Sequence, residues 1–529
     1  MKYTKSLVAA LAIAASAMMT SCDPSDFGDI NVNPNYPTDS YTYMQFQFAS
    51  VYARNFIMSS SSYDPWAMEW SGYLAEAKNN QYGPLGVTTD YATGSYYYYP
   101  IKNLTNIINA NTNEETKSLV AVTAFGSNNN QIAVATTLRA FYYMTLSDIN
   151  GPIVYSEALQ AVDGNFEPKL DAQKDVYAGL DAELKEAYSK FDTSENLYQG
   201  KADIFFGGDI KKWKKFNATL RMMLAIKLAD VDPSTGKARF AAAYSDGGMT
   251  SADDSFTYTF DATYASAWFY TIGNESNPSQ NFYFAPNKVF VDALKEYQDP
   301  RLFTYATIGQ NRYAYLGSRP GDEYDFDAYI GIPFGLESNG AVGDAKAIAC
   351  STAPKYCERT ATYGLITAAR CLLVEAEAAE LGWISADAAS LYAQGIQASF
   401  DFEAGSDKAF DPSQATDYIA AHPLPADKDA ALKEIVMQRF LAGFLTDGVE
   451  AWSDWRRYNI PTLPMYQGQV NEGHTRYPQR LKFAASDYSS NEDQIRAALS
   501  DISGGADDAW ARVWWDVADN ISPYAPGVQ

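Results

Sequence analysis

The chain has 529 residues, of which 14% are aromatic, and its 64 acidic and 40 basic residues give a formal net charge of −24. This charge repels nucleic acids and other polyanions, and no basic stripe offsets it. With two histidines, no paired Cys/His zinc spacing and no GxSxG, Walker A or GxGxxG motif, the sequence also argues against histidine triads, HExxH peptidases and nucleotide-binding motifs.

The N-terminus has the pattern of a secretory signal peptide. Lys2 and Lys5 precede an apolar run of 13 residues, from Leu7 to Met19. At about 1.5 Å per residue this run falls short of a hydrocarbon core of ~30 Å, so it is too short for a membrane anchor. We therefore interpret residues 1–21 as a leader that is removed, which takes the formal net charge from −24 to −26.

Cys22 follows two small residues, and this junction resembles a bacterial lipobox, in which the new N-terminal cysteine is acylated. Met19 departs from the leucine that is usual three places before such a cysteine. The acidic residues that come next resemble the surface-export signal of Bacteroidota lipoproteins: Asp23, Asp26 and Asp29. The resemblance implies a lipid-anchored protein of the outer membrane that faces the cell exterior. The alternative is ordinary cleavage nearby, with Cys22 incidental.

Six segments have the spacing of apolar residues that is typical of amphipathic helices. They cover residues 132–142, 176–191, 213–228, about 365–381, 385–400 and about 432–445. We expect the third to stop before Asp232-Pro233, because the residue before a proline disfavours helical backbone, and Ser385 can cap the fifth. The pattern predicts a mostly α-helical protein.

The fourth and fifth of these helices are joined by a short turn and predict an αα-hairpin. Small residues on the fourth, among them Ala369 and Ala376, would let the fifth approach closely. Helix pairs of this kind are the unit of tetratricopeptide solenoids, but no clean repeat of about 34 residues is detectable. The residues by themselves therefore predict an irregular helical array.

Three long polar, aromatic and Gly/Pro-rich stretches separate the helices: residues 59–100, 253–286 and 310–354. Loops of this length inside a compact domain usually carry function, so we expect ligand contacts on loops held by a rigid helical frame. No shift in composition and no Pro/Ser linker divides the chain, and we expect one large domain.

Beyond Cys22 the cysteines are Cys350, Cys357 and Cys371, too few for a disulfide framework. Cys350 and Cys357 either close a short loop or remain thiols, and the sequence leaves both alternatives open. Cys371 lies in the fourth helical pattern and is predicted to be a buried thiol.

A series of short motifs spans nearly the whole chain. They are NVNPN at 31–35, LSDINGP at 146–152, FEPKLD at 166–171, WKKFN at 213–217, DPRL at 299–302, EAEA at 375–378, YPQR at 477–480 and WWD at 514–516. In order and spacing they resemble the SusD/RagB family of surface nutrient-binding lipoproteins of Bacteroidota, in particular its SusD-like branch.

The resemblance implies a mostly α-helical SusD-like fold, with tetratricopeptide-like helix pairs packed with long irregular loops. It implies a signal peptide at 1–21, an acidic tether and extended strap at 22–40, and a single helical domain at 41–529. It also implies that the protein is not an enzyme. It would capture an oligosaccharide or another nutrient and deliver it, as a hinged lid, to a SusC-like TonB-dependent outer-membrane transporter.

We expect the motif residues to have structural roles. Gly151-Pro152 ends a helix. Arg456 and Arg457, close to Trp452 in the sequence, can pair with buried carboxylates or stack on rings. Trp514-Trp515 is expected to belong to a core cluster.

No family motif locates the ligand, so the candidates come from the composition of the long loops. Tyr and Trp rings can stack on the apolar faces of sugars, while Asn and Arg bond their hydroxyls. The candidates are Trp66, Trp70, Tyr82, Tyr97 and Tyr98 in the first stretch, Trp268, Tyr270 and Asn274 in the second, and Arg312, Tyr313 and Tyr315 in the third. The alternative for each is packing within its loop or contact with the transporter.

No cofactor is expected, although calcium sites occur in some relatives. An acidic group could hold one such ion, or form a solvated loop instead: Asp322, Glu323, Asp325 and Asp327. Three other functions remain open: a surface glycan hydrolase with a carboxylate pair, a helical scaffold that binds only protein, and a peptide-binding member of the same family.

Overall fold

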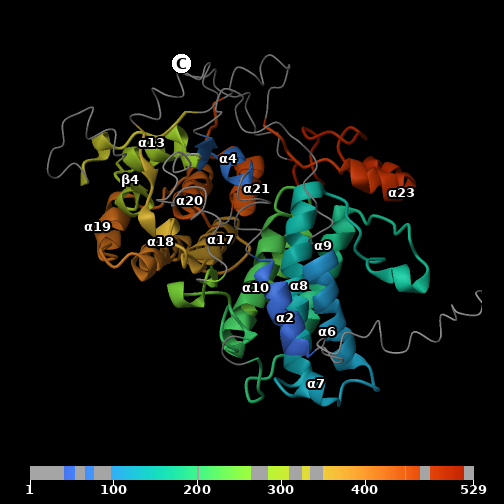
Figure 1. Cartoon of the computed structure of the whole chain (residues 1–529). Helices are drawn as coiled ribbons and strands as arrows, with labels where there is room; N and C mark the ends of the chain where they lie inside the picture. The colour runs from blue at the N-terminus through green and yellow to red at the C-terminus, as the bar shows by residue number, and fades with distance from the viewer. Residues whose placement is uncertain are drawn as a thin grey trace, which may run out of the picture. The chain divides into compact units, whose positions relative to one another are not determined.

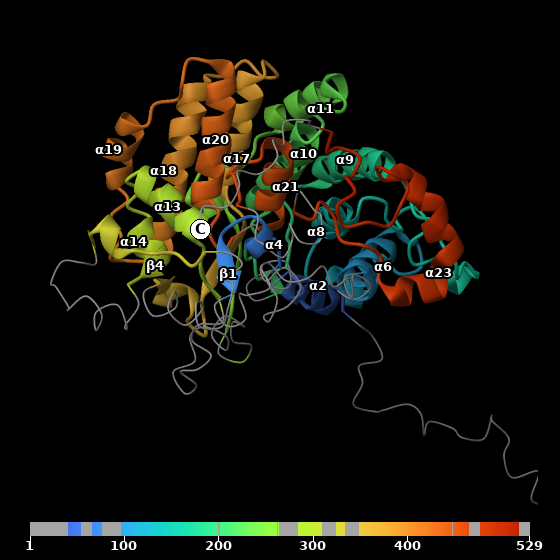
Figure 2. The ribbon, with the colours of Figure 1, turned by 90° about the horizontal axis from the view of Figure 1, so that it is seen from above.

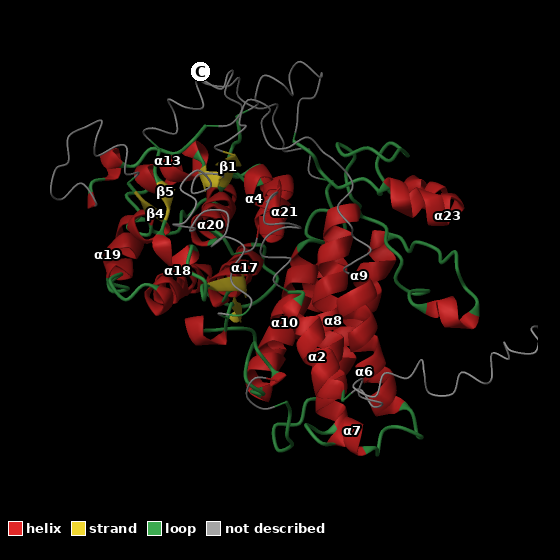
Figure 3. Ribbon diagram, viewed as in Figure 1, coloured by secondary structure: helices red, strands yellow, loops and turns green. Residues whose placement is uncertain are grey.

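The computed structural model describes residues 41–53, 66–76, 97–198, 202–261, 263, 284–308, 324–333, 349–446, 448–464 and 477–517. From Thr42 onward the chain forms one compact unit. This unit is mostly helical, as the sequence predicts (Figures 1 and 3). Among the described residues, no helix has the length and apolar character needed to cross a membrane.

The helices of the N-terminal half are α2 (Thr42–Val51), α4 (Trp66–Trp70), α6 (Lys102–Thr112), α7 (Val120–Thr123), α8 (Asn128–Asn150), α9 (Gln173–Lys190), α10 (Ile210–Ile226) and α11 (Pro233–Asp246). Those of the C-terminal half are α13 (Lys288–Glu296), α14 (Leu302–Tyr305), α17 (Ala368–Glu380), α18 (Ala388–Ser406), α19 (Gln414–Ala421), α20 (Lys428–Ala442), α21 (Gly448–Tyr458) and α23 (Ala485–Ala498). Consecutive helices pack as pairs, as α8 does with α9, α10 with α11 and α17 with α18.

Short π-helical and 3₁₀ turns connect these helices. They are η3 (Tyr97–Ile101), η4 (Gln160–Asp163), η6 (Ala252–Asp254), η8 (Phe326–Ala328), η9 (Pro354–Tyr356) and η10 (Leu499–Asp501). Three antiparallel two-stranded sheets pair β1 (Leu74–Glu76) with β3 (Phe284–Pro286), β2 (Phe256–Thr259) with β6 (Thr362–Ile366), and β4 (Ala306–Thr307) with β5 (Ser351–Thr352). In the first sheet Ala75 lies opposite Ala285. Each sheet joins segments that are distant in sequence.

The three helices predicted in the N-terminal half are confirmed, since the patterns at 132–142, 176–191 and 213–228 correspond to α8, α9 and α10. α10 ends at Ile226, before Asp232. Asp232 instead begins α11, where its side chain accepts a hydrogen bond from the Thr235 N–H at 3.2 Å. Gly151 directly follows α8 with a φ of 85°, a conformation that favours glycine, so the predicted helix end is also confirmed.

The predicted pair of α17 and α18 is present, but its limits differ. The predicted start of the helix, at about residue 365, belongs instead to β6 (Thr362–Ile366), so α17 begins only at Ala368. Asp387 caps α18 in place of the predicted Ser385 and accepts a hydrogen bond from the Ala389 N–H at 3.1 Å. The close approach also needs a glycine, because a Cβ on Gly395 would lie 2.6 Å from Cγ of Leu373.

The pattern at 432–445 corresponds to α20, which begins at Lys428 because Asp427 caps it. The three stretches predicted as loops contain short elements: α4, β1 and η3 in the first, β2 and β3 in the second, and η8 and β5 in the third. Most of the remaining residues of these stretches lie outside the described residues.

The three cysteines within the described residues are thiols. Cys357 is free, so the bridge to Cys350 that the sequence left open is not formed in this structure. Burial raises the pKa of Cys357 to about 12. Cys371 is buried, as predicted, and its Sγ lies 3.3 Å from Oγ1 of Thr219.

A buried ion cluster joins α8, α21 and the residue that follows α10. Nζ of Lys227 lies 2.6 Å from Oδ2 of Asp148 and 2.8 Å from Oε1 of Glu450. Burial alone would lower the pKa of Lys227, but the two carboxylates raise it, so the lysine stays charged. Oδ1 of Asp148 also accepts hydrogen bonds from the Tyr177 hydroxyl and, at 3.0 Å, from Nε1 of Trp515.

Arg456 of α21 stacks on rings, as the sequence suggests. Its guanidinium lies 3.6 Å from the ring centre of Trp452 and 4.5 Å from that of Trp515. Nη1 donates hydrogen bonds to the main-chain oxygens of Asp148 at 2.8 Å and Gln479 at 2.9 Å. The fully buried Trp515 confirms the predicted core position.

Arg457 makes the predicted pair with a buried carboxylate. Its Nη2 lies 2.8 Å from Oε1 of Glu377 on α17. Burial alone would raise the pKa of Glu377, but Arg457 and Arg439 hold it below its usual range. Asp454 continues this cluster, with Nη2 of Arg439 and Nη1 of Arg370 each 2.8 Å from its carboxylate.

Replacing Lys227 by methionine should strongly destabilise the protein. The change leaves Asp148 and Glu450 buried without their cation, and breaking a buried pair in this way costs about 3–5 kcal/mol. Urea unfolding followed by tryptophan fluorescence measures the loss. Lys211→Met, at an exposed lysine in the first turn of α10, is the matched control. Equal effects of the two substitutions would contradict the role given to the cluster.

Glu375 of α17 makes stability depend on pH. Burial raises its pKa from 4.5 to about 7, and a contact with Sγ of Cys371 at 3.6 Å only partly offsets this. Between these two values the folded state binds more protons than the unfolded state, so the free energy of unfolding falls as pH rises. Over the whole window the loss is roughly 3 kcal/mol.

The variant Glu375→Gln should lack this part of the pH dependence. Relative to the wild type it should gain stability between pH 5 and pH 8, by roughly 2–3 kcal/mol. Urea unfolding of both proteins at the two pH values measures the difference. Glu296→Gln, at an exposed position, should leave it unchanged. A constant difference between wild type and Glu375→Gln would show that Glu375 is ionised in the folded state at both pH values.

Candidate functional site

Three aromatic rings meet where α2 contacts η3, and we call them the aromatic cluster: the exposed Phe48 and Tyr99 and the half-buried Tyr52. The rings of Tyr52 and Tyr99 stack with their centroids 5.2 Å apart and an interplanar angle of 13°. The ring of Phe48 lies 5.3 Å from that of Tyr52 and 6.3 Å from that of Tyr99. Phe48 and Tyr99 are each 46% exposed, so the rings hold one another in place and remain accessible.

The packing of α2 explains why these rings face outward. On its inner face Phe46 packs against Trp213 of α10 with ring centroids 5.9 Å apart. The main-chain oxygen of Ala49 accepts a hydrogen bond from the Tyr142 hydroxyl of α8 at 2.7 Å. Figures 1 and 2 show α2 outside α8, at the edge of the helices of the N-terminal half. Its other face, which includes Phe48, is therefore left toward solvent.

The turn η3 holds Tyr99 and packs against α2 and α6. Nδ2 of Asn103 donates a hydrogen bond to the main-chain oxygen of Tyr99 at 2.6 Å, which fixes the start of α6. Tyr97 and Tyr98, two of the predicted ligand contacts, belong to the same turn. Their side chains are not among the described ones, so their contact with a ligand stays a prediction.

The segments around the aromatic cluster are almost free of charge. Residues 41–53 and 97–112 contain no Asp or Glu, and Lys102 is their one charged residue. Amide side chains are frequent instead, as at Gln45, Gln47 and Asn103. Such a surface suits a neutral ligand with apolar faces and hydroxyl edges.

Trp66 and Trp70 were predicted as ligand contacts on a loop, and this prediction is wrong. Both lie in α4, where they are 2% and 1% exposed. Their ring centroids lie 5.2 Å and 5.6 Å from that of Trp452 on α21. The four-residue spacing places both rings on one helix face, so they pack between α4 and α21 and are closed off from a ligand.

The other candidates lie outside the described residues, and their roles stay predictions: Tyr82, Trp268, Tyr270, Asn274, Arg312, Tyr313 and Tyr315. The same is true of the proposed acylation at Cys22.

The acidic group considered for calcium is described only in part, at Asp325 and Asp327. The side chain of Asp325 accepts a hydrogen bond from the Asp327 N–H at 2.9 Å, and Oδ1 of Asp327 lies 3.6 Å from Nζ of Lys295. Within the described ranges no cluster of three or more potential metal-binding side chains occurs. Calcium binding stays a prediction.

Tyr324, within the third long stretch, is another exposed aromatic residue. It is 72% exposed, and its ring centroid lies 5.7 Å from that of Phe303. Phe303 in turn packs against Phe326 at 4.7 Å and Tyr329 at 5.6 Å. The ring is therefore fixed on one side only and is a further candidate contact.

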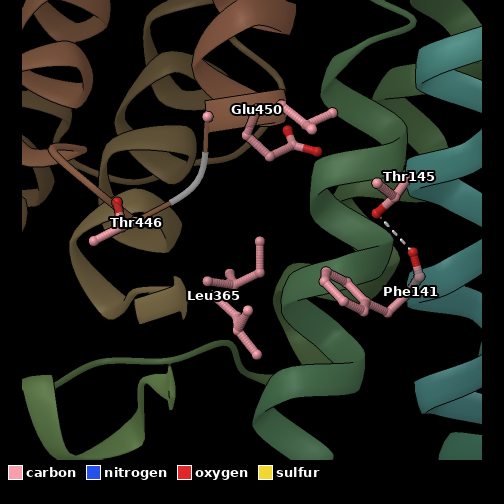
Figure 4. Close-up of a pocket in the computed structure, with 8 residues that line it drawn as sticks. Phe141, Thr145, Leu365, Thr446 and Glu450 are labelled. Atoms are coloured by element: carbon pink, nitrogen blue, oxygen red, sulfur yellow. Dashed lines mark hydrogen bonds between the residues drawn. The ribbon is translucent and has the colours of Figure 1, made fainter. Parts of the chain in front are cut away.

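Figure 4 shows an interior cleft between α8, β6 and the start of α21. Its lining consists of Phe141, Thr145, Leu365, Ile366, Thr446, Gly448, Val449 and Glu450. The Thr145 hydroxyl donates to the main-chain oxygen of Phe141 at 2.9 Å, and Glu450 pairs with Lys227. Because these polar groups are already engaged, we interpret the cleft as a packing gap.

The sequence analysis did not select Phe48, Tyr52 or Tyr99, although it selected Tyr97 and Tyr98, the two residues before Tyr99. The signal lay in α2 itself. Apolar or aromatic residues at 44, 48 and 52 repeat every four residues on the face opposite Phe46 and Ala49. A short helix needs only one apolar face to pack against the core, so a second apolar face is a candidate contact surface.

Comparisons with known proteins cover most of the unit that begins at Thr42. A SusD-like family with the description "Starch-binding associating with outer membrane" matches residues 42–484. A chitin-binding protein of known structure is 25% identical, with a TM-score of 0.74 over 90% of this chain and 100% of that chain. A chitin-binding SusD homologue from Flavobacterium johnsoniae is 23% identical, with a TM-score of 0.71 over 90% of this chain and 100% of that one. A SusD homologue from Bacteroides fragilis is 22% identical, with a TM-score of 0.72 over 88% and 99%.

A search of curated protein sequences finds no match.

Proposed function

The chain belongs to the SusD-like family of starch-binding proteins that associate with the outer membrane, and on this ground we propose that it captures oligosaccharides at the cell surface. It then hands them unchanged to a SusC-like TonB-dependent transporter, over which it acts as a hinged lid. The chitin-binding relatives support a carbohydrate ligand. The protein itself breaks no bond.

The aromatic cluster is the observation that carries the proposal. Sugars have apolar C–H faces and hydroxyl edges, and the half-exposed rings of Phe48 and Tyr99 present flat surfaces for the faces. Each ring is already ordered by its neighbours, so little side-chain entropy is lost when a sugar stacks on it. Amide side chains nearby can bond the hydroxyls.

Such a site suits moderate affinity. A Kd near micromolar corresponds to about −8 kcal/mol, which a few stacked rings and hydrogen bonds supply after the ordering costs. Much tighter capture would hinder transfer to the transporter. The net charge of −26 after leader removal opposes acidic glycans and leaves neutral ones unaffected.

Attachment to the membrane is part of the same proposal. Acylated Cys22 would hold the protein at the outer face of the outer membrane, with residues 22–40 as the tether. The leader that ends at residue 21 and the acidic residues after it support this placement.

Replacing Tyr99 by alanine should weaken binding without unfolding the protein. Loss of one stacked ring costs about 0.5–1.5 kcal/mol, which is roughly a 2- to 10-fold increase in Kd. Calorimetric titration with the best ligand from a panel of soluble oligosaccharides measures it. Phe166→Ala removes a ring that is 75% exposed in the segment before α9 and should leave Kd unchanged.

The same panel tests the other functions. Release of reducing ends by the wild-type protein would overturn the proposal in favour of a hydrolase. Binding of peptides but of no glycan would assign the protein to peptide import, and binding of the transporter alone would make it a scaffold.

Replacing Cys22 by alanine should remove the lipid anchor. Wild-type cells fed a clickable fatty acid should label the protein, and protease added to whole cells should digest it. The variant should take up no label and leave the membrane fraction. Equal labelling of both proteins would show that Cys22 is not the acylated residue.

A further inference from the structure

Three large apolar side chains lie exposed in or next to α7, and we call them the apolar tip: Leu119, Val120 and Phe125. Their exposed fractions are 51%, 71% and 41%. Val122, on the same short helix, is buried and fastens it to the core. Figure 3 shows α7 at the end of the helices α2, α6 and α8. Neighbouring exposed apolar side chains of this kind indicate a contact surface.

Amide side chains at the start of α8 hold the main chain of the tip in place. Nε2 of Gln131 donates hydrogen bonds to the main-chain oxygens of Val122 at 2.6 Å and Gly126 at 2.7 Å. Nδ2 of Asn128 donates one to the main-chain oxygen of Lys117 at 2.9 Å. The exposed side chains are thus carried by a fixed backbone, so little ordering entropy is lost when they bind.

The tip lies in a long stretch of sequence without charge. Of the whole chain 20% is charged, so a stretch of this length would ordinarily include several charges, yet residues 118–138 contain none. The adjoining helix α2 contains none either. Acidic side chains stand at the rim instead: Glu114 and Glu115 precede the stretch, and Glu195 lines a hollow together with residues 123–127. The tip is therefore an apolar surface with acidic groups around it.

The chain enters the compact unit beside this tip. The hydroxyl of Thr42, the first residue of the unit, contacts the main-chain oxygen of Val122 at 3.3 Å. Residues 22–41 precede it and, under the proposed function, connect the unit to the acylated Cys22. These 20 residues span at most about 70 Å, so a contact between the unit and the membrane is intramolecular, and a weak one suffices. The tip is the exposed apolar surface that adjoins the point of attachment.

We propose that the apolar tip inserts into the lipid surface to which the protein is anchored, so that the protein is held there at two points, its acyl group and the tip. This inference rests on the membrane attachment in the proposed function and adds a second contact to it. Insertion is shallow, because the acidic groups at the rim stay in the water of the headgroup layer. The second contact fixes the orientation of the unit on the membrane, which a single tether leaves free.

A second exposed apolar pair shows what distinguishes the tip. Val162 and Phe166, in the segment before α9, are 92% and 75% exposed. Asp163 and Glu167 directly follow them, and a charge brought into lipid is costly, so this pair is unsuited to insertion. A membrane surface with anionic groups also repels a chain of net charge −24, and the uncharged end approaches it with the least repulsion. These charges favour a lipid surface at the tip and exclude it at the second pair.

The test measures whether the tip enters lipid when the protein is held by its N-terminus. The mature chain, residues 22–529 with Cys22→Ser and an N-terminal hexahistidine tag, is bound to phosphatidylcholine vesicles that contain a nickel-chelating lipid. A solvent-sensitive dye is attached at Val120→Cys or, as the matched control, at Val162→Cys. The protein without an added cysteine gives the background from the native thiols. The dye at position 120 should shift its emission to the blue and be quenched by lipids with a nitroxide on the acyl chain, and the dye at position 162 should do neither.

A further substitution keeps the fold and weakens insertion. Leu119→Ser removes a half-exposed leucine, which should lower the ratio of inserted to free tip about 3- to 10-fold. Leu119 is the N-cap residue of α7, a position that favours serine, so the fold should be preserved. Urea unfolding of the undyed variant checks this, and the loss of quenching at position 120 measures the effect.

Three results would overturn the proposal: no quenching at position 120, equal quenching at positions 120 and 162, or no effect of Leu119→Ser. A blue shift at position 120 that rises with protein density on the vesicle, without quenching by the nitroxide lipids, would assign the tip to contact between copies instead. Because the nickel tether replaces the acyl group, these outcomes are distinct from a failure of acylation at Cys22, which the labelling of cells detects separately.

Discussion

A single buried lysine fixes how the helices of this protein are placed. Lys227 pairs with two carboxylates, at positions 148 and 450, and Arg456 and Trp515 close the cluster. Charges removed from water are tolerated only when they are paired with good geometry. An arrangement that brought together α8 and α10 but left α21 elsewhere would keep the Lys227–Asp148 pair and lose the one with Glu450. The cluster therefore selects one arrangement of segments that are hundreds of residues apart.

This constraint reaches the aromatic cluster through α2. The helix is anchored by Phe46 against α10 and by the bond from Tyr142 to Ala49 on α8, the two helices whose ends meet at Lys227. Because contacts of the inner face hold α2 in place, the outer face is not needed for core packing. Its rings can then be arranged for a ligand without loss of core packing.

The sequence predicted the features that depend on local pattern. The apolar period gave α8, α9 and α10, and the clustering of arginine and tryptophan near 452–457 correctly suggested stacking and buried pairs. The sequence-based predictions failed where contacts between distant segments determine the structure. Leu365 and Ile366 were predicted as the start of the helix that became α17, but they belong to β6, which pairs with β2. Trp66 and Trp70 stand in a polar stretch and look exposed, yet Trp452, almost 400 residues away, covers them. Phe48 was missed because burial and exposure cannot be distinguished for an apolar residue before its helix has a neighbour.

The apolar face of α2 also affects how many copies of the protein behave together. The exposed apolar side chains Met44 and Phe48 favour contact with the same surface on a neighbouring copy. The excess of 64 acidic over 40 basic residues opposes such contact, because like-charged copies repel within a Debye length of about 8 Å at physiological salt. Acidic surroundings that protonate the carboxylates would remove this repulsion and let the copies self-associate. The net negative charge thus opposes contact between the exposed apolar surfaces of neighbouring copies.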